Sequence, residues 1–264
     1  IVNSGNANAC TGARGIADAE TMASLVARRL GCAPESVLVC STGVIGHYLP
    51  MDVIGVGIEV VVEALGDSAE SFAAASRAMM TTDTVLKQSV EGARLAGDAC
   101  RVRGATKGAG MIGPSMAARL AVVMTDASLN QQQTDAVLRQ AVDSSFNSIS
   151  VEGHTSTSDT VLLLAGGSGE VLEREDDLEA ITGAVTRVCQ DLARAIVADA
   201  EGAGQADEIA ATDVFRQQLG ETRRGVDTGK PPRAMKRIGI GRAHGGSISE
   251  RGAASQHARR VNRS

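Results

Sequence analysis

Apolar residues recur every three or four positions in five stretches of the chain, which is the spacing of amphipathic helices. The helices predicted from this pattern span Ile16–Leu30, Met51–Leu65, Ala69–Met80, Asn130–Phe146 and Asp176–Ala200. The first helix is followed by Gly31, a residue type that commonly ends helices. Ser128 or Asn130 can cap the fourth helix, because a short polar side chain accepts a hydrogen bond from the first turn.

Short apolar runs between these helices predict buried strands. Val37–Cys40 and Leu120–Met124 are rich in Val and Leu, and each run ends at polar turn residues. The turn after the first run is Ser41–Gly43. Thr160–Leu164 is also apolar, but its pattern fits either a strand or a helix. Helices and strands alternate without an internal repeat, so the predicted fold class is α/β.

The composition is that of a globular protein. Of the 264 residues, 43% are hydrophobic and 22% are charged, which excludes a wholly disordered chain and suits one large domain or two small ones. The uncharged apolar runs are too short to cross a bilayer, so no membrane partner is expected. The chain has no Trp, one Tyr and three Phe, which argues against an aromatic surface for nucleic acid.

Charge is distributed unevenly along the chain. Residues 1–220 contain 15 Lys and Arg against 28 Asp and Glu, a net charge of −13, whereas residues 221–264 contain 11 against 3, a net charge of +8. The apolar periodicity fades near residue 202, and Gly, Arg and Ser dominate from residue 223. This composition predicts a disordered or non-native tail. Its clustered Arg residues leave salt-dependent nucleic-acid binding as a weak hypothesis.

The cysteines and histidines favour neither a disulfide framework nor a metal site. The five cysteines are odd in number and contain no CxxC pair, which favours a reducing, cytoplasmic compartment. The four histidines lack the spacing of metal ligands, so no metal is expected.

Uncharged Gly, Ser, Thr and Asn concentrate at residues 3–12, 41–46 and 104–114, with a further polar cluster at 155–159. One such segment would be an ordinary turn, but several together indicate backbone amides that approach a small molecule. In the second segment, Thr42 and Gly43 can present a hydroxyl and an N–H group to a developing oxyanion, or can simply form a capping turn.

Two other polar segments have a structural and a functional interpretation. Thr81–Thr84 follows a predicted helix and fits an Asx-type turn or a ligand contact. Lys107 lies in a predicted loop of small residues with no carboxylate neighbour in sequence, so its partner is a substrate carboxylate or solvent. Residues 108–113 match GxGxxG, but Pro114 follows at once and leaves no room for the helix of a dinucleotide site.

Longer motifs run in one order through residues 1–203. They read NSGNANACTG at 3–12, STGVIG at 41–46, MTTDT at 80–84, TKGAGMI at 106–112 with Pro114, TDA at 125–127, SFN at 145–147 and TSTSDTVLLL at 155–164. Together these motifs resemble the ornithine acetyltransferase family, the bifunctional glutamate N-acetyltransferases of arginine biosynthesis. Because many long motifs match in order, the resemblance is far more specific than any single motif.

The resemblance implies a layered α/β sandwich and a ping-pong acetyl transfer from N-acetylornithine to glutamate. Members of the family cleave themselves between an Ala and a Thr, and the new N-terminal Thr is the nucleophile. The resemblance assigns Thr42 and Gly43 to the oxyanion site and Thr81 and Lys107 to substrate contacts. It implies no cofactor, with acetyl-CoA as an additional acetyl donor in some members, and a dimer of cleaved pairs.

The motif around the nucleophile departs from the family. The family reads Met-Ala-Thr-Met-Leu, whereas this chain reads Met-Ala-Ala-Arg-Leu, with Ala118 at the nucleophile position and Arg119 after it. The cleavage junction would fall between Ala117 and Ala118. Loss of a covalent nucleophile lowers rates by about 10⁴–10⁶-fold, so we expect impaired acetyl transfer and no self-cleavage. The alternative is a non-catalytic relative that binds N-acetylated amino acids.

The resemblance also divides the chain. Residues 1–203 correspond to the acetyltransferase-like region, and residues 204–264 form a basic tail outside the family pattern. The opening strands and the closing Asn-bearing motif of the family are not found, so the fold is expected to be incomplete at both ends.

Overall fold

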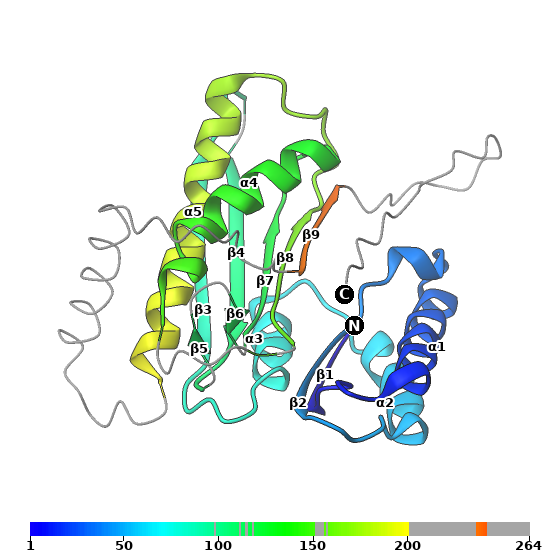
Figure 1. Cartoon of the computed structure of the whole chain (residues 1–264). Helices are drawn as coiled ribbons and strands as arrows, with labels where there is room; N and C mark the ends of the chain where they lie inside the picture. The colour runs from blue at the N-terminus through cyan, green and yellow to red at the C-terminus, as the bar shows by residue number, and fades with distance from the viewer. Residues whose placement is uncertain are drawn as a thin grey trace.

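The computed structural model describes residues 1–97, 99–110, 112–113, 116–117, 119–150, 156, 158–200 and 236–241. Its helices are α1 (Gly12–Leu30), α2 (Met51–Glu63), α3 (Ala69–Ala78), α4 (Gln131–Asp143) and α5 (Glu175–Ala198), with 3₁₀ turns η1 (Pro34–Ser36) and η2 (Phe146–Ser148). Its strands are β1 (Val2–Asn6), β2 (Cys40–Val44), β3 (Lys87–Arg94), β4 (Ala99–Lys107), β5 (Ile112–Gly113), β6 (Met116–Ala117), β7 (Leu120–Thr125), β8 (Thr160–Ala165) and β9 (Lys236–Gly241). The chain is therefore a mixed α/β protein, as predicted (Figure 1).

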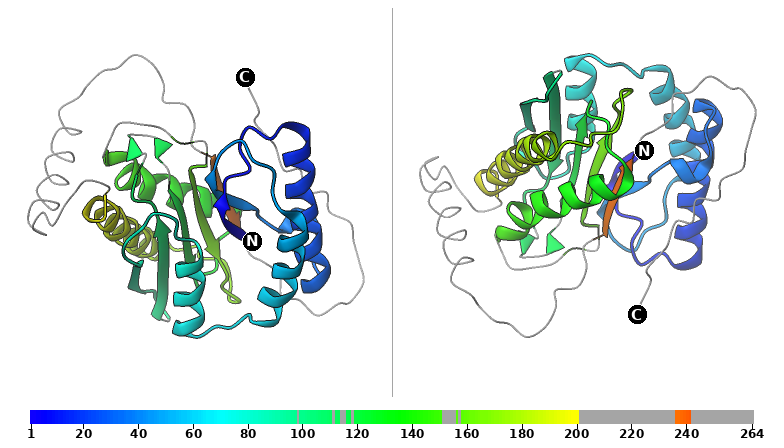
Figure 2. Two further views of the ribbon diagram at one scale, coloured as in Figure 1. Left: turned by 90° about the horizontal axis from the view of Figure 1, so that it is seen from below. Right: turned by 90° about the horizontal axis from the view of Figure 1, so that it is seen from above.

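The larger sheet has the strand order β3-β4-β7-β8-β9. Its first three strands are antiparallel, and β7, β8 and β9 run parallel to one another. Helices α4 and α5 cover one face of this sheet (Figure 2), where Val123, Leu163, Val188 and Leu192 are fully buried in one core. At Gly104 an added Cβ would lie 2.6 Å from Val188 Cγ1, so the missing side chain lets α5 approach β4 closely.

The opposite face of the sheet packs against the N-terminal part of the chain. A second core joins Cys40 of β2 and Met79 after α3 to Ala105, Leu120 and Leu162 of the sheet. The result is a layered arrangement, with helices on one face of the large sheet and the β1–β2 unit with α3 on the other (Figures 1 and 2).

The N-terminal unit pairs β1 and β2 in parallel, and its helices α1 and α2 pack against each other. Met22 and Val26 of α1 pack with Leu49 and Ile58 in a third core. The helix α2 leaves much of its apolar surface exposed. No helix in the described part of the chain combines the length and apolar character of a membrane span.

The predicted helices are confirmed, with shifts at their ends. Helix α1 starts at Gly12, before the predicted Ile16, and ends at Gly31 with a left-handed φ of 67°. Asn130 caps α4 in a reciprocal capping box with Gln133, which decides between the two predicted caps. The ambiguous run at Thr160 is strand β8.

The predicted strand Val37–Cys40 is wrong, because β2 spans Cys40–Val44 and includes the residues expected to turn. Its partner is β1, in register from Val2 opposite Cys40 to Asn6 opposite Val44. Both strands are short and mostly polar, so apolar periodicity could not reveal them. They are strands because their backbones pair with each other, although they are far apart in the sequence.

The structure also differs from the predicted loops and tail. Residues 104–107 belong to β4 rather than to a loop, since β7 pairs with all four of them and β3 pairs with residues 104–106. Strand β9 lies within the segment expected to be disordered. It runs parallel to β8, with Lys236 opposite Thr160, and this pairing supplies backbone hydrogen bonds that a composition argument cannot detect. The rest of residues 204–264 lies outside the described residues.

Candidate functional site

Thr42 and Gly43 lie side by side on β2, opposite Ser4 and Gly5 of β1. The Thr42 side chain is buried, with the residue 7% exposed. Gly43 has a φ of 132°, and an added Cβ would lie 2.2 Å from the Gly5 carbonyl carbon. Only glycine fits there, because both the backbone angle and the approach of β1 exclude a side chain.

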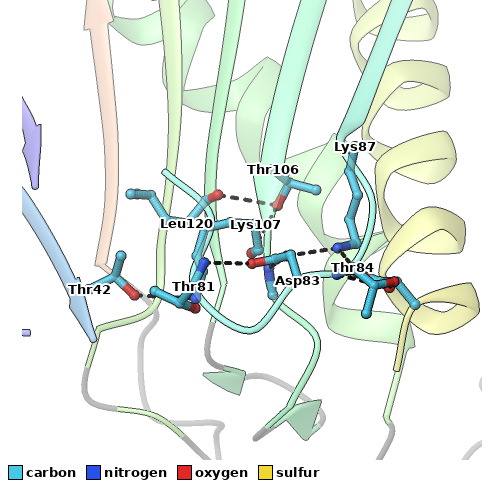
Figure 3. A network of polar contacts seen from close by, with 10 residues as sticks. Thr42, Thr81, Asp83, Thr84, Lys87, Thr106, Lys107 and Leu120 are labelled. Atoms are coloured by element: carbon cyan, nitrogen blue, oxygen red, sulfur yellow. Dashed lines mark hydrogen bonds and ion pairs between the residues drawn. The ribbon is translucent and has the colours of Figure 1, made fainter. Parts of the chain in front are cut away.

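Lys107 is the last residue of β4, and it is buried rather than solvated, with 4% of its surface exposed. Its Nζ lies 3.4 Å from Thr42 Oγ1 and donates a hydrogen bond to it (Figure 3). This contact joins the end of the large sheet to the small β1–β2 sheet. A hydroxyl and an ammonium predicted from two separate motifs therefore meet in one place.

Thr81 reaches the same region from the loop after α3. Ser4 Oγ donates to the carbonyl of Met80 at 2.8 Å, which ties this loop to β1. The N–H group of Thr81 donates to Asp83 Oδ2 at 3.0 Å. In an Asx-type turn the acceptor side chain precedes its donor, whereas here it follows, so the loop is not the predicted Asx-type turn. The Thr81 residue itself is exposed.

Asp83 connects this loop to the end of β4. Its Oδ1 accepts a hydrogen bond from Lys87 Nζ at 2.7 Å (Figure 3). The same oxygen also accepts a hydrogen bond from Gly108 N at 2.6 Å. Lys87 also donates to Asp199, the residue that caps the C-terminal end of α5. Thr84 donates its N–H to the same carboxylate at 3.0 Å. The side chains of Lys87 and Asp83 are completely buried.

The pKa values of the two carboxylates reflect this pairing. Burial raises the pKa of Asp83, but hydrogen bonds from Lys87, Gly108 and Thr81 and the charge of Lys87 outweigh burial and hold it below its ordinary value. Burial likewise raises the pKa of Asp199, and the bonds from Lys87 and Thr84 bring it below its ordinary value. Both groups are therefore carboxylates at neutral pH.

Two buried ionisable residues, Arg119 and Asp159, lie beside the position predicted for the nucleophile in sequence and in space. The N–H group of Arg119 donates to Asp159 Oδ1 at 2.9 Å, and the Arg119 guanidinium donates to the carbonyl of Phe146. Burial lowers the pKa of Arg119 to about 10, opposed by Asp159. Burial raises the pKa of Asp159 to about 7, although the charges of Arg119 and Lys107 oppose that rise.

Three of the predicted site residues, Thr42, Gly43 and Lys107, are adjacent, and Thr81 is connected to them through Asp83 and Gly108. Ala118 lies outside the described residues.

Sequence reasoning included Asp83 and Asp159 only as members of polar motifs, without a role of their own, and it did not identify Lys87 or Asp199. For Asp83 the MTTDT motif was a signal, but nothing local marked Lys87 or Asp199 as its partners. Lys107 had no carboxylate near it in sequence, yet folding brings Asp159 within its electrostatic influence.

The residue types at this site suit recognition of an acyl amino acid. A buried hydroxyl with a neighbouring N–H group can bind a carbonyl oxygen, and a buried ammonium can bind a carboxylate. After Gly108 the described chain forms the short strands β5 and β6 rather than a helix, which agrees with the rejection of a dinucleotide motif. Among the described residues, no group of three or more His, Cys, Asp or Glu side chains is arranged to hold a metal ion.

Comparison with known proteins agrees with the resemblance. The ArgJ family profile matches residues 1–220, which extends past residue 203. An arginine biosynthesis bifunctional protein ArgJ of Rhodopirellula baltica is 44% identical over 213 residues, covering 79% of this chain and 52% of that protein. The ArgJ protein of Geobacter sulfurreducens is 47% identical over 212 residues, covering 79% of this chain and 53% of that protein. The chain thus spans about half the length of these relatives.

A solved structure is also similar in sequence. It is an ornithine acetyltransferase of Mycobacterium tuberculosis complexed with ornithine, with 39% identity and a TM-score of 0.38, covering 43% of this chain and 60% of that chain.

Proposed function

The chain belongs to the ArgJ family, and we propose that it carries the acyl-binding part of an enzyme that transfers acetyl from N-acetylornithine to glutamate in arginine biosynthesis. The observation that carries this proposal is the contact between Lys107 and Thr42. It brings together two of the motifs by which the chain resembles ornithine acetyltransferases, although these motifs lie on different sheets.

In this proposal Thr42 and Gly43 bind the acetyl oxygen. The Thr42 hydroxyl and the Gly43 N–H group would stabilise the negative charge that develops on that oxygen during acyl transfer. Removal of one such donor from an oxyanion site typically costs on the order of 10²–10³ in rate. The Lys107 ammonium polarises the Thr42 hydroxyl and attracts an anionic ligand, and Thr81 contacts the same ligand from the loop after α3.

The residue at the nucleophile position limits the proposed reaction in this chain. The family pattern requires Thr where Ala118 stands, and Ala has no hydroxyl for the acyl shift or for acetyl transfer. We therefore propose that the chain is not cleaved between residues 117 and 118 and transfers acetyl only slowly. Ala118 also favours a second candidate function, in which the chain binds N-acetylated amino acids without reacting with them.

The remaining proposals follow the family. Acetyl-CoA would be a second acetyl donor rather than a bound cofactor, and the protein would act in the cytoplasm as a homo-oligomer. Residues 1–203 would form the acetyltransferase-like unit, with the basic tail outside it.

Two measurements test the proposal. Isothermal titration calorimetry should detect N-acetylornithine binding to the chain, and Lys107→Met should weaken it about tenfold or more, because a charge-assisted bond of 1.5–3 kcal/mol is lost. Arg103→Met is the matched control, since Arg103 lies on the same strand and stacks on Phe72. Absence of binding, or equal loss in both variants, would rule out the assigned site.

Acetyl transfer from N-acetylornithine to glutamate should be barely measurable in the chain and should rise in Ala118→Thr, with two fragments in a denaturing mass spectrum. Binding without any gain of transfer in Ala118→Thr would favour the non-catalytic function instead.

A further inference from the structure

The Asp83 carboxylate uses both of its oxygens to hold backbone groups of the candidate site. Oδ2 accepts the N–H of Thr81 at 3.0 Å (Figure 3), and Oδ1 accepts the N–H of Gly108 at 2.6 Å. The side chain is completely buried, so water cannot replace these bonds. One carboxylate therefore connects the loop after α3 to the residue at which the chain leaves β4.

These two backbone groups belong to the segments that carry the predicted ligand contacts. Thr81 is one of these contacts, and Gly108 directly follows Lys107, which is another. Gly108 has a φ of 144°, so the chain changes direction there, immediately after the lysine. The bond from Gly108 to Asp83 holds this change of direction in place, and it thereby determines where β4 ends and where Lys107 is anchored.

Asp83 also neutralises the charge of Lys87, but a second carboxylate, that of Asp199, contributes to this as well. Lys87 Nζ donates to Asp83 Oδ1 at 2.7 Å and also to Asp199. Asp199 in turn accepts the N–H of Thr84 at 3.0 Å, and it contacts neither Thr81 nor Gly108 in the described hydrogen bonds. The two carboxylates therefore share one ammonium, but only Asp83 holds the backbone beside the ligand contacts.

We propose that Asp83 is a positioning residue for ligand binding, which orients Thr81 and Lys107 toward the same acylated amino acid by holding the N–H groups of Thr81 and Gly108. This inference rests on the proposed function, since it concerns the ligand that these residues bind. It adds to that function a residue that need not touch the ligand.

The test compares Asp83→Asn, Asp83→Ala and Asp199→Asn in the full chain. The Kd for N-acetylornithine is measured by calorimetry, and thermal unfolding is measured in parallel. An amide oxygen can still accept an N–H bond, whereas Ala accepts none. We expect Asp83→Asn to weaken binding about tenfold and Asp83→Ala about a hundredfold, on the basis of the worth of bonds to a charged acceptor.

Asp199→Asn is the matched control. Like Asp83→Asn, it removes one of the two carboxylates that neutralise Lys87 and keeps the other. We expect it to lower the Tm about as much as Asp83→Asn does but to change the Kd less than about twofold. Amide hydrogen exchange at Thr81 and Gly108 should accelerate in the Asp83 variants alone. If Asp83→Ala does not fold, the comparison of the two isosteric Asn variants still decides the question.

The outcomes separate the two claims. If the unchanged chain binds but Asp83→Asn and Asp199→Asn lose affinity equally, Asp83 serves only to neutralise Lys87 and the positioning role is wrong. Equal Kd values for Asp83→Asn and Asp83→Ala would contradict it in the same way. If the unchanged chain does not bind N-acetylornithine, the proposed function fails, and the positioning role for this ligand fails with it.

Discussion

Asp159 makes the stability of this protein depend on pH in a direction opposite to that of most carboxylates. The residue is 6% exposed and precedes β8, where its Oδ1 accepts the N–H of Arg119 at 2.9 Å. Burial raises the pKa of Asp159 from an ordinary value of 3.8 to about 7, despite the opposing charges of Arg119 and Lys107. Between these two pH values the folded protein holds a proton that the unfolded chain has released.

The sign of the effect follows from this difference in bound protons. The proton stabilises the fold at low pH, and this contribution is lost as the pH rises toward 7. In that range each pH unit changes the free energy of unfolding by about 1.4 kcal/mol. Raising the pH from 5 to 8 should therefore lower the free energy of unfolding by about 3 kcal/mol. The variant Asp159→Asn cannot ionise, and its amide oxygen can still accept the N–H of Arg119. The free energy of unfolding of Asp159→Asn, relative to that of the unchanged chain, should therefore be about 3 kcal/mol higher at pH 8 than at pH 5.

Urea unfolding at pH 5, 6, 7 and 8 measures this difference, provided that the m values agree between variants. Val161→Ala is the control, because Val161 is fully buried on β8 and has no charge. It should lower stability by the same amount at every pH. A difference between Asp159→Asn and the unchanged chain that stays constant from pH 5 to 8 would refute the reasoning, and it would mean that Arg119 and Lys107 outweigh burial.

Three further variants, one of them with a control, test local contributions to stability by denaturant unfolding. Gly43→Ala should lower stability by about 3 kcal/mol or more, because its Cβ would collide with the backbone of β1, whereas Gly92→Ala should cost less than about 1 kcal/mol because its Cβ meets nothing closer than 4.0 Å. Arg119→Met should raise stability by about 1–3 kcal/mol, because Nε and Nη2 of the buried guanidinium have no hydrogen-bond partner among the described residues. A loss of stability would contradict this and would mean that other groups in the fold compensate the buried positive charge of Arg119. Asn130→Ala should cost about 1–2 kcal/mol through loss of the α4 capping box, and an unchanged midpoint would contradict that role.

The sequence alone was sufficient for features that depend on neighbouring residues. Apolar spacing identified the five helices of the described chain, and Gly31 and Asn130 marked two of their ends, because a helix is stabilised by contacts three and four positions apart. The continuous apolar run of β7 was recognisable for a similar reason, since a strand buried on both faces needs no partner to reveal it. The family motifs gave the candidate residues Thr42, Gly43, Thr81 and Lys107.

Only the tertiary structure decided how these residues are brought together. The polar residues of β2 form a strand because they pair with β1, and no apolar pattern marks them as a strand. Lys107 meets Thr42 across 65 positions of sequence, and Lys87 joins Asp83 to an Asp199 that lies 112 positions away. A backbone hydrogen bond or a buried ion pair between distant residues leaves no local periodicity. These contacts form because folding buries the polar groups, and each group must then find a partner inside the protein.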